Sequence, residues 1–377
     1  MEDKNLSILK DLKVKSGSHS PSIETILERT SIEIDVDACF LSNPYATDLF
    51  MSRFNKEIID SGRLRNLLEF YPPQNGAVAE YISKFTGVPS ENIFVGNGAI
   101  EIIQAVLHRF IGKSIALPIP TFSSYYEFVT GGATVEYFQL EKERNYSMDI
   151  QKYADFCISK KVSSAVLINP NNPDGGYVSK EEITKFLSRL SHLECIILDE
   201  SFIHFAYEDI NLEEIALGDL VQKYPNLVVI KSMSKDFGVA GLRAGFSIMK
   251  KERVAQLLET GFLWNLSGLT AYLFKLLSDE SFQREYQIVR KKYIMNTLMF
   301  FQELSALKSV HVIPSKANFA LVEIKGKSSW DAFAYLLSKG IYVRDCSDKI
   351  GLKGSYIRVA SRTFEENLRI IEALKSI

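Results

Sequence analysis

Short apolar segments alternate with longer amphipathic segments through the middle of the chain, and this alternation restricts the fold more than any other feature. Several short segments are apolar on both faces, which is typical of parallel strands buried between two layers of helices. We therefore expect an α/β protein with a mostly parallel central sheet covered by helices. The expected strands cover residues 92–95, 114–117, 133–138, 165–168, 195–198, 227–230 and 244–248, and the expected helices cover 76–86, 99–110, 180–190 and 215–223.

The pattern changes after Gly268, where longer helical segments are followed by only a few short strands. This change indicates a smaller α/β domain at the C-terminal end, and 377 residues are enough for two domains. The N-terminal segment is expected to be an arm that packs on the small domain or on a neighbouring subunit. The expected division is an arm over residues 1–45, a large domain over 46–267 and a small domain over 268–377.

Four of the expected strands end in polar or glycine-rich loops. These loops cover residues 96–98, 169–175, 199–200 and 232–235. Parallel α/β sheets bind ligands at the carboxyl ends of their strands. The sequence therefore predicts one ligand site formed by these loops.

The loop that contains Lys235 is the most informative of these four loops. Its sequence is Ser-Met-Ser-Lys-Asp-Phe-Gly-Val-Ala-Gly-Leu-Arg-Ala-Gly over residues 232–245. Most lysines are solvated, but this one follows an apolar strand and has small and hydroxyl-bearing neighbours. A lysine held in such a place can form a Schiff base if its pKa is lowered. Ser232 and Arg243 are suited to binding a phosphate. The alternative is a glycine-rich turn with an incidental lysine.

This segment resembles the lysine motif of fold-type I enzymes that depend on pyridoxal 5'-phosphate (PLP), in the class I/II aminotransferase branch. It fills every fixed position of Ser-x-Ser-Lys-x-x-Gly-x-x-Gly-x-Arg-x-Gly, and the rest of the family signature follows in order over nearly the whole chain. The resemblance implies the fold-type I architecture, PLP bound to Lys235, and a homodimer with active sites at the subunit interface.

The resemblance also assigns the residues that contact the cofactor. Asp199 is expected to pair with the pyridine nitrogen, Asn172 to bond the ring hydroxyl oxygen, and Phe122 to stack on the ring. Taken alone, these are equally a helix cap, a turn former and a core residue. The expected phosphate contacts are Gly98, Ala99 and Ile100 at a helix start, Ser232, Ser234, Arg243, and Tyr71 from the other subunit.

Two subfamilies fit best, histidinol-phosphate aminotransferases and threonine-phosphate decarboxylases. Phe202 stands where aminotransferases of this branch commonly have tyrosine, and it matches the Asp-Glu-x-Phe form of the decarboxylases. The stretch over residues 343–367 resembles the decarboxylase tail. The resemblance implies that Arg344, Arg358, Asn43 and His19 face the substrate, although arginines more often form surface ion pairs.

The expected reaction is therefore PLP-dependent decarboxylation of an O-phospho-L-amino acid, L-threonine phosphate or L-serine phosphate, to the amine phosphate and CO2. The alternative is aminotransfer on a phosphorylated amine or keto compound, as in histidinol-phosphate aminotransferases. Each bond to the substrate α-carbon breaks most readily when it stands perpendicular to the pyridine ring of PLP, so the orientation of the substrate decides between the two reactions. The sequence does not report that angle.

Composition excludes several other classes. The net charge of −2, from 44 basic and 46 acidic residues, does not favour nucleic acid or an anionic membrane as a partner. The apolar runs are too short to span a bilayer. The four cysteines match no zinc pattern, so no metal is expected. Reduced thiols are the default interpretation, and we therefore expect a cytoplasmic location.

Overall fold

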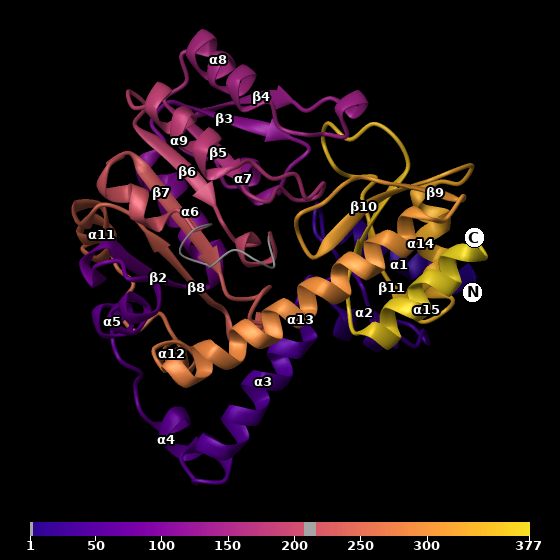
Figure 1. The fold of residues 1–377 in the computed structure, drawn as a ribbon, viewed down its shortest axis with the longest axis horizontal. Coiled ribbons are helices and arrows are strands. Elements are labelled where there is room, and N and C mark those ends of the chain that lie inside the picture. The colour runs from indigo at the N-terminus through magenta and orange to yellow at the C-terminus, as the bar shows by residue number, and fades with distance from the viewer. Residues whose placement is uncertain (1–2, 207–215) are drawn as a thin grey trace.

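The computed structural model describes residues 3–206 and 216–377. The larger part of the molecule is built around a seven-stranded sheet, with the strand order β2-β8-β7-β6-β5-β3-β4 (Figure 1). Neighbouring strands from β7 across to β4 pair in parallel, and β8 is antiparallel to both of its neighbours. The strands are β2 (Ile93–Asn97), β3 (Ser114–Ile119), β4 (Thr134–Gln139), β5 (Ser164–Ile168), β6 (Cys195–Asp199), β7 (Leu227–Ser232) and β8 (Ala244–Ile248).

Helices cover both faces of this sheet, which confirms the predicted α/β class. On α6, the residues Ile102, Ile103, Val106, Leu107 and Phe110 recur at helical spacing and are buried against the sheet. Each such side chain contributes about 1.5–3 kcal/mol of burial free energy. One face is covered by α5 (Asn75–Thr86), α8 (Ile150–Lys160), α9 (Lys180–Arg189) and α12 (Gly268–Leu277), and the other by α6 (Gly98–Phe110) and α11 (Lys251–Leu258).

The helix expected over residues 215–223 is wrong in its described part. Only a short 3₁₀ helix, η5 (Gly218–Gln222), forms there, and Ile215 lies outside the described residues. Gly218 packs so closely on β8 that a Cβ atom would lie 2.4 Å from Ile248 Cδ1. This close contact requires glycine at position 218, and glycine and the proline at 225 both disfavour an α-helix over this stretch.

The smaller part holds a four-stranded antiparallel sheet with the order β12-β13-β10-β9. A two-stranded parallel pair, β1 with β11, joins the N-terminal segment to this part. The strands are β1 (Val36–Asp37), β9 (Val310–Val312), β10 (Phe319–Ile324), β11 (Ile341–Tyr342), β12 (Arg344–Asp345) and β13 (Tyr356–Ala360). The helices are α1 (Asp3–Lys15), α2 (Ile23–Arg29), α14 (Ser329–Leu337) and α15 (Phe364–Lys375).

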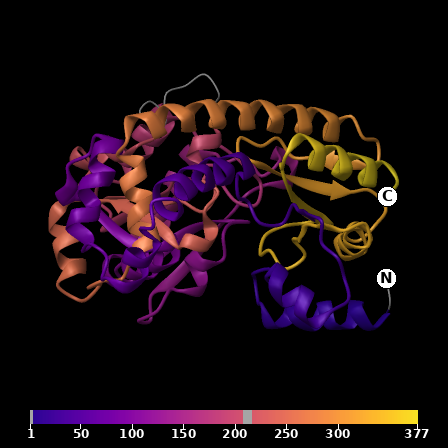
Figure 2. The same ribbon diagram turned by 90° about the horizontal axis from the view of Figure 1, so that it is seen from below.

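The long helix α13 (Glu280–Ser305) connects the two parts and runs along both of them, as Figure 2 shows from below. The N-terminal helices α1 and α2 lie against the small part, where Leu9 and Ile26 are buried in the same core as Ile370. Among the described helices, none combines the length and the apolar character needed to cross a bilayer.

Candidate active site

The carboxyl ends of three parallel strands meet at one edge of the large sheet. Ile168 of β5 pairs with Asp199 of β6, and Asp199 pairs in turn with Ile230 of β7. The polar loops that follow these strands therefore begin side by side. This arrangement brings together the loops that the sequence predicted to form one site.

The loop that carries Lys235 is held by a segment from near the N-terminus. The Lys235 carbonyl accepts a hydrogen bond from Asn43 N at 2.8 Å, and Ser42 Oγ donates to the Ser234 carbonyl at 3.0 Å. Gly238 has φ +66°, and a Cβ there would lie 2.3 Å from the Asn43 carbonyl oxygen. Only glycine fits this close contact between the lysine loop and the N-terminal segment.

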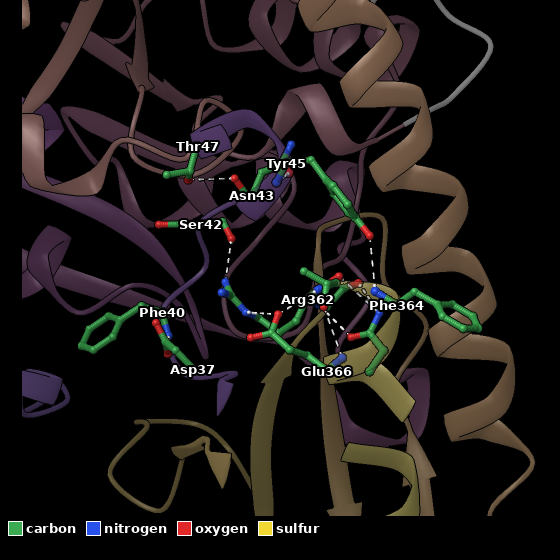
Figure 3. A network of polar contacts seen from close by, with 12 residues as sticks. Asp37, Phe40, Ser42, Asn43, Tyr45, Thr47, Arg362, Phe364 and Glu366 are labelled. Atoms are coloured by element: carbon green, nitrogen blue, oxygen red, sulfur yellow. Dashed lines mark hydrogen bonds and ion pairs between the residues drawn. The ribbon is translucent and has the colours of Figure 1, made fainter. Parts of the chain in front are cut away.

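The same N-terminal segment is also bound to the C-terminal end of the chain (Figure 3). Arg362 Nη1 donates to the Ser42 carbonyl at 3.0 Å, and Phe364 N donates to Tyr45 Oη at 3.3 Å. The segment thus lies between the lysine loop of the large part and the start of α15 in the small part.

The Lys235 amine is electrostatically unusual. Burial, and then the charges of Arg358 and Arg243, lower its pKa to about 8. A neutral amine is the nucleophilic form, so a much larger fraction of Lys235 is reactive near neutral pH than of an ordinary lysine.

Asp199 is buried and accepts two hydrogen bonds. Tyr125 Oη donates to its Oδ2 at 2.8 Å, and Ser201 N donates to its Oδ1 at 2.8 Å. Burial raises the pKa of the Asp199 carboxyl, while the hydrogen bonds from Ser201 and Tyr125 oppose the rise. Sequence reasoning missed Tyr125, because no local pattern connects it with Asp199, 74 positions away.

The start of α6 presents backbone amides and a guanidinium close together. Asn97 provides no side-chain cap there, so the first amides of the helix lack acceptors. Gly98 has φ +79°, and a Cβ on it would lie 2.5 Å from Arg243 Nη2. Gly245 pairs with Ser232 across the sheet, and a Cβ on it would lie 2.7 Å from Ala99 N. The expected phosphate contacts on α6, β7 and Arg243 are therefore together in space.

Arg358 and Asn172 form a buried pair beside this site. Arg358 Nη1 donates to Asn172 Oδ1 at 2.6 Å, and Nη2 donates to the Cys39 carbonyl at 2.9 Å. The guanidinium lies 5.3 Å from the centre of the Phe319 ring. Within residues 3–206 and 216–377 no carboxylate forms an ion pair with Arg358, so its charge is available to an anionic ligand.

Arg344 and His19 lie where the N-terminal arm contacts both parts of the molecule. Arg344 Nη2 donates to the Ser18 carbonyl at 2.8 Å and to Asp348 Oδ2 at 2.6 Å. His19 Nε2 lies 3.3 Å from Glu127 Oε2, and its ring centre lies 5.9 Å from that of Phe122. The predicted ring-stacking residue and a predicted substrate residue are therefore neighbours.

Three singled-out residues lie in settings that sequence reasoning did not anticipate. The Asn43 side-chain Oδ1 accepts from Tyr45 N and Ala46 N, and Nδ2 donates to the Asp236 carbonyl. Asn43 thus caps α3 (Pro44–Phe54) and supports the lysine loop, and its second Nδ2 hydrogen stays available for the predicted contact with the substrate. Tyr71 is 80% exposed beside Trp264. Phe202 packs on Phe319 in a small apolar cluster.

A group of buried charges lies directly behind the lysine loop, and we call Lys231, Asp236 and His204 the lysine-loop cluster. Lys231 Nζ donates to Asp236 Oδ2, and His204 Nδ1 lies 2.9 Å from the same oxygen. Burial opposes ionisation of Asp236, but Lys231 and His204 outweigh it and hold its pKa at about 2. Burial, and then Lys231, lower the pKa of His204 to about 4. Lys231 and Asp236 are therefore a charged pair beside a neutral histidine.

Known proteins resemble the chain over nearly its whole length. The sequence profile of aminotransferases of class I and II matches residues 42–374. An L-serine phosphate decarboxylase from Campylobacter jejuni is 52% identical over 369 residues, which are 97% of this chain and 95% of that protein. A histidinol-phosphate aminotransferase from Methanococcus aeolicus is 33% identical over 341 residues, 89% of this chain and 88% of the relative. The solved structure of a decarboxylase from Sulfurospirillum multivorans has a TM-score of 0.93 at 43% identity, covering 98% of this chain and 95% of its own.

Proposed function

This chain belongs to the aminotransferase class I and II family, and from that premise we propose that it is a PLP-dependent decarboxylase of L-serine phosphate. The match over residues 42–374 confirms the resemblance that the lysine motif indicated. The observation that carries the reaction is the 52% identity to an L-serine phosphate decarboxylase over 97% of the chain. The products would be ethanolamine phosphate and CO2.

The residues present fit PLP. The uncapped start of α6 and Arg243 suit the phosphate group, and the glycine at 98 lets the Arg243 guanidinium come close to the start of the helix. Asp199 offers a carboxylate to the pyridine nitrogen. Asn172 has Oδ1 engaged by Arg358, which leaves Nδ2 to donate to the ring hydroxyl oxygen. Lys235 supplies the amine.

Bound PLP supplies an electron-accepting ring that stabilises the charge left when a bond to the substrate α-carbon breaks. Lys235 then has two tasks in the proposed reaction. Its neutral amine holds the cofactor, and its ammonium form, with a pKa of about 8, can deliver a proton to the carbon that loses CO2. Arg344 and Arg358 bind the anionic groups of the substrate, and thereby set which bond stands perpendicular to the ring.

We further propose a homodimer. Tyr71 is 80% exposed and stacks beside the half-exposed Trp264, and Leu68, Phe70 and Leu263 are exposed nearby in sequence. Such a group of exposed large apolar side chains is typical of an interaction surface. In the proposed dimer this surface lies at the subunit interface, and Tyr71 reaches the cofactor phosphate of the partner. The four free, buried cysteines accord with the proposed cytoplasmic location.

A mass balance tests the reaction. The PLP-loaded enzyme is incubated with L-serine phosphate or L-threonine phosphate, with and without 2-oxoglutarate, and CO2, amine phosphate and glutamate are measured. We expect CO2 and ethanolamine phosphate in equal amounts without any keto acid. Glutamate formed only when 2-oxoglutarate is present would instead identify an aminotransferase.

A further inference from the structure

Lys349 is a buried cation that the proposed reaction has not yet used. It lies in the loop after β12 and is 8% exposed, although lysines are rarely buried without a charged partner. Its Nζ faces the Ser18 carbonyl at 3.4 Å. Arg344 Nη2 donates to the same oxygen at 2.8 Å. Two cationic groups from the small part thus converge on one neutral oxygen of the arm.

The acidic residues around this point do not balance the charge. Asp348 Oδ2 is shared between Arg344, at 2.6 Å, and Lys13, at 3.2 Å. The carboxylate of Asp345 is turned to Ser347, with Oδ2 2.7 Å from its hydroxyl. Among the residues that the structure describes, none forms a carboxylate ion pair with Lys349. Asp348 is therefore shared by two cations in direct contact, and Lys349 has no carboxylate in direct contact among the described residues.

This excess of positive charge lies on the substrate side of the site. Ser18 precedes His19, whose ring neighbours Phe122. Burial and then the charge of Arg344 lower the pKa of Lys349 to about 8, although the Asp348 carboxylate opposes the shift. The charge of Arg358 also lowers this pKa, so both guanidinium groups lie within electrostatic reach of Lys349. We call Arg344, Lys349 and Arg358 the arm cluster.

We propose that Lys349 is a specificity-determining residue that binds the substrate phosphate together with Arg344. This inference rests on the proposed function and deepens it. A phosphate monoester is a dianion near neutral pH and has three acceptor oxygens, so it can pair with both cations and complete their hydrogen bonds. A monoanionic sulfonate or carboxylate can balance only one of them. Lys349 thus makes the site select a dianionic substrate.

The test compares three L-amino acids that differ in the group on the β-carbon. L-serine phosphate carries a phosphate dianion, L-cysteate carries a monoanionic sulfonate, and L-serine carries a neutral hydroxyl. Because the enzyme is proposed to consume L-serine phosphate, the dissociation constants are measured near pH 7 on the PLP-loaded enzyme from the rapid change in cofactor absorbance that precedes turnover. The variants are Lys349→Gln, Lys349→Arg and, as a matched control from the same loop, the exposed Lys353→Gln.

For Lys349→Gln we expect binding of L-serine phosphate to weaken roughly 10- to 100-fold, since a hydrogen bond to a charged group is lost. Binding of L-cysteate should weaken much less, and that of L-serine should not change. Lys349→Arg keeps the charge and should retain most of the preference for phosphate, and Lys353→Gln should behave as the wild type. Equal losses for all three ligands, or an unchanged phosphate preference in Lys349→Gln, would overturn the inference.

The outcome separates this inference from the proposed function. If the wild type releases CO2 from L-serine phosphate and Lys349→Gln retains the phosphate preference, only the role of Lys349 is wrong. If the wild type binds L-serine phosphate through Lys349 but releases no CO2, only the proposed reaction is wrong. A wild type without any phosphate preference contradicts the role of Lys349 directly.

Discussion

The lysine-loop cluster and the arm cluster are both buried groups of charges, yet they differ in how the charges are matched. Lys231 is 4% exposed and Lys349 is 8% exposed, so the two lysines are buried to a similar degree. Lys231 has the carboxylate of Asp236 as its partner, whereas Lys349 faces a backbone carbonyl. Burial alone therefore does not distinguish a structural charge from a ligand-binding one. A buried lysine with a carboxylate partner, such as Lys231, stabilises the fold, whereas a buried lysine without one, such as Lys349, is suited to binding an anionic ligand.

The largest expected effect concerns Lys235, which borders both clusters. Lys235→Ala removes the amine that holds PLP, so the absorbance band of the Schiff base between PLP and the lysine should disappear. Activity should fall on the order of a thousandfold or more, because the nucleophile and the proton donor are lost together. Absorbance spectra and initial rates check this. A variant with an unchanged spectrum would reject Lys235 as the attachment site.

Asp236→Asn breaks the lysine-loop cluster. It leaves the Lys231 ammonium buried without a carboxylate, and we expect the free energy of unfolding to fall by about 3–5 kcal/mol. Denaturant titration of the cofactor-free protein measures the loss. The control is Asp219→Asn, an exposed acid whose contact with Lys180 is loose at 3.6 Å. Equal stability of the Asp236 and Asp219 variants would contradict the distinction between the clusters.

Arg358→Ala affects the arm cluster, and here the main effect should be on binding. We expect L-serine phosphate to bind roughly 10- to 100-fold more weakly, with a much smaller loss for L-serine. Stability should fall by about 1–3 kcal/mol, less than in Asp236→Asn, because neutral oxygens on Asn172 and Cys39 lose their donor.

Ligand titrations and denaturant unfolding check both parts of this prediction. Arg369→Ala, at a surface ion pair with Asp35, is the control and should change neither quantity appreciably. Equal losses for L-serine phosphate and L-serine would argue that Arg358 does not recognise phosphate.

Local patterns in the sequence were sufficient for much of the fold. The strands of the large sheet were predicted to within a few residues, because each is a short apolar run followed by a polar turn. Loops such as 169–175 and 232–235 were also found, since residues that follow neighbouring parallel strands meet at one sheet edge. The antiparallel direction of β8 was not predicted, because apolar periodicity is the same in both directions.

Contacts between distant segments could not be predicted in this way. The hydrogen bond from Tyr125 to Asp199 joins residues 74 positions apart, and no local pattern marks either as the partner of the other. Lys349 lies in a short polar loop, where a lysine is ordinarily solvated. Its burial depends on the arm at Ser18, which is 331 positions away. The capping of α3 by Asn43 was not predicted either, because the contact with substrate was inferred from the family resemblance alone.

The segment over residues 42–47 has a consequence for how the protein folds. It meets the lysine loop through a contact 192 positions apart in sequence, and it is fixed in turn by Arg362, 320 positions away. Closing such long loops is slow, because the chain loses conformational entropy before the stabilising contacts have formed. During synthesis this segment emerges long before Arg362 and must wait for it. The lysine loop therefore acquires its final support only after residue 362 has been made.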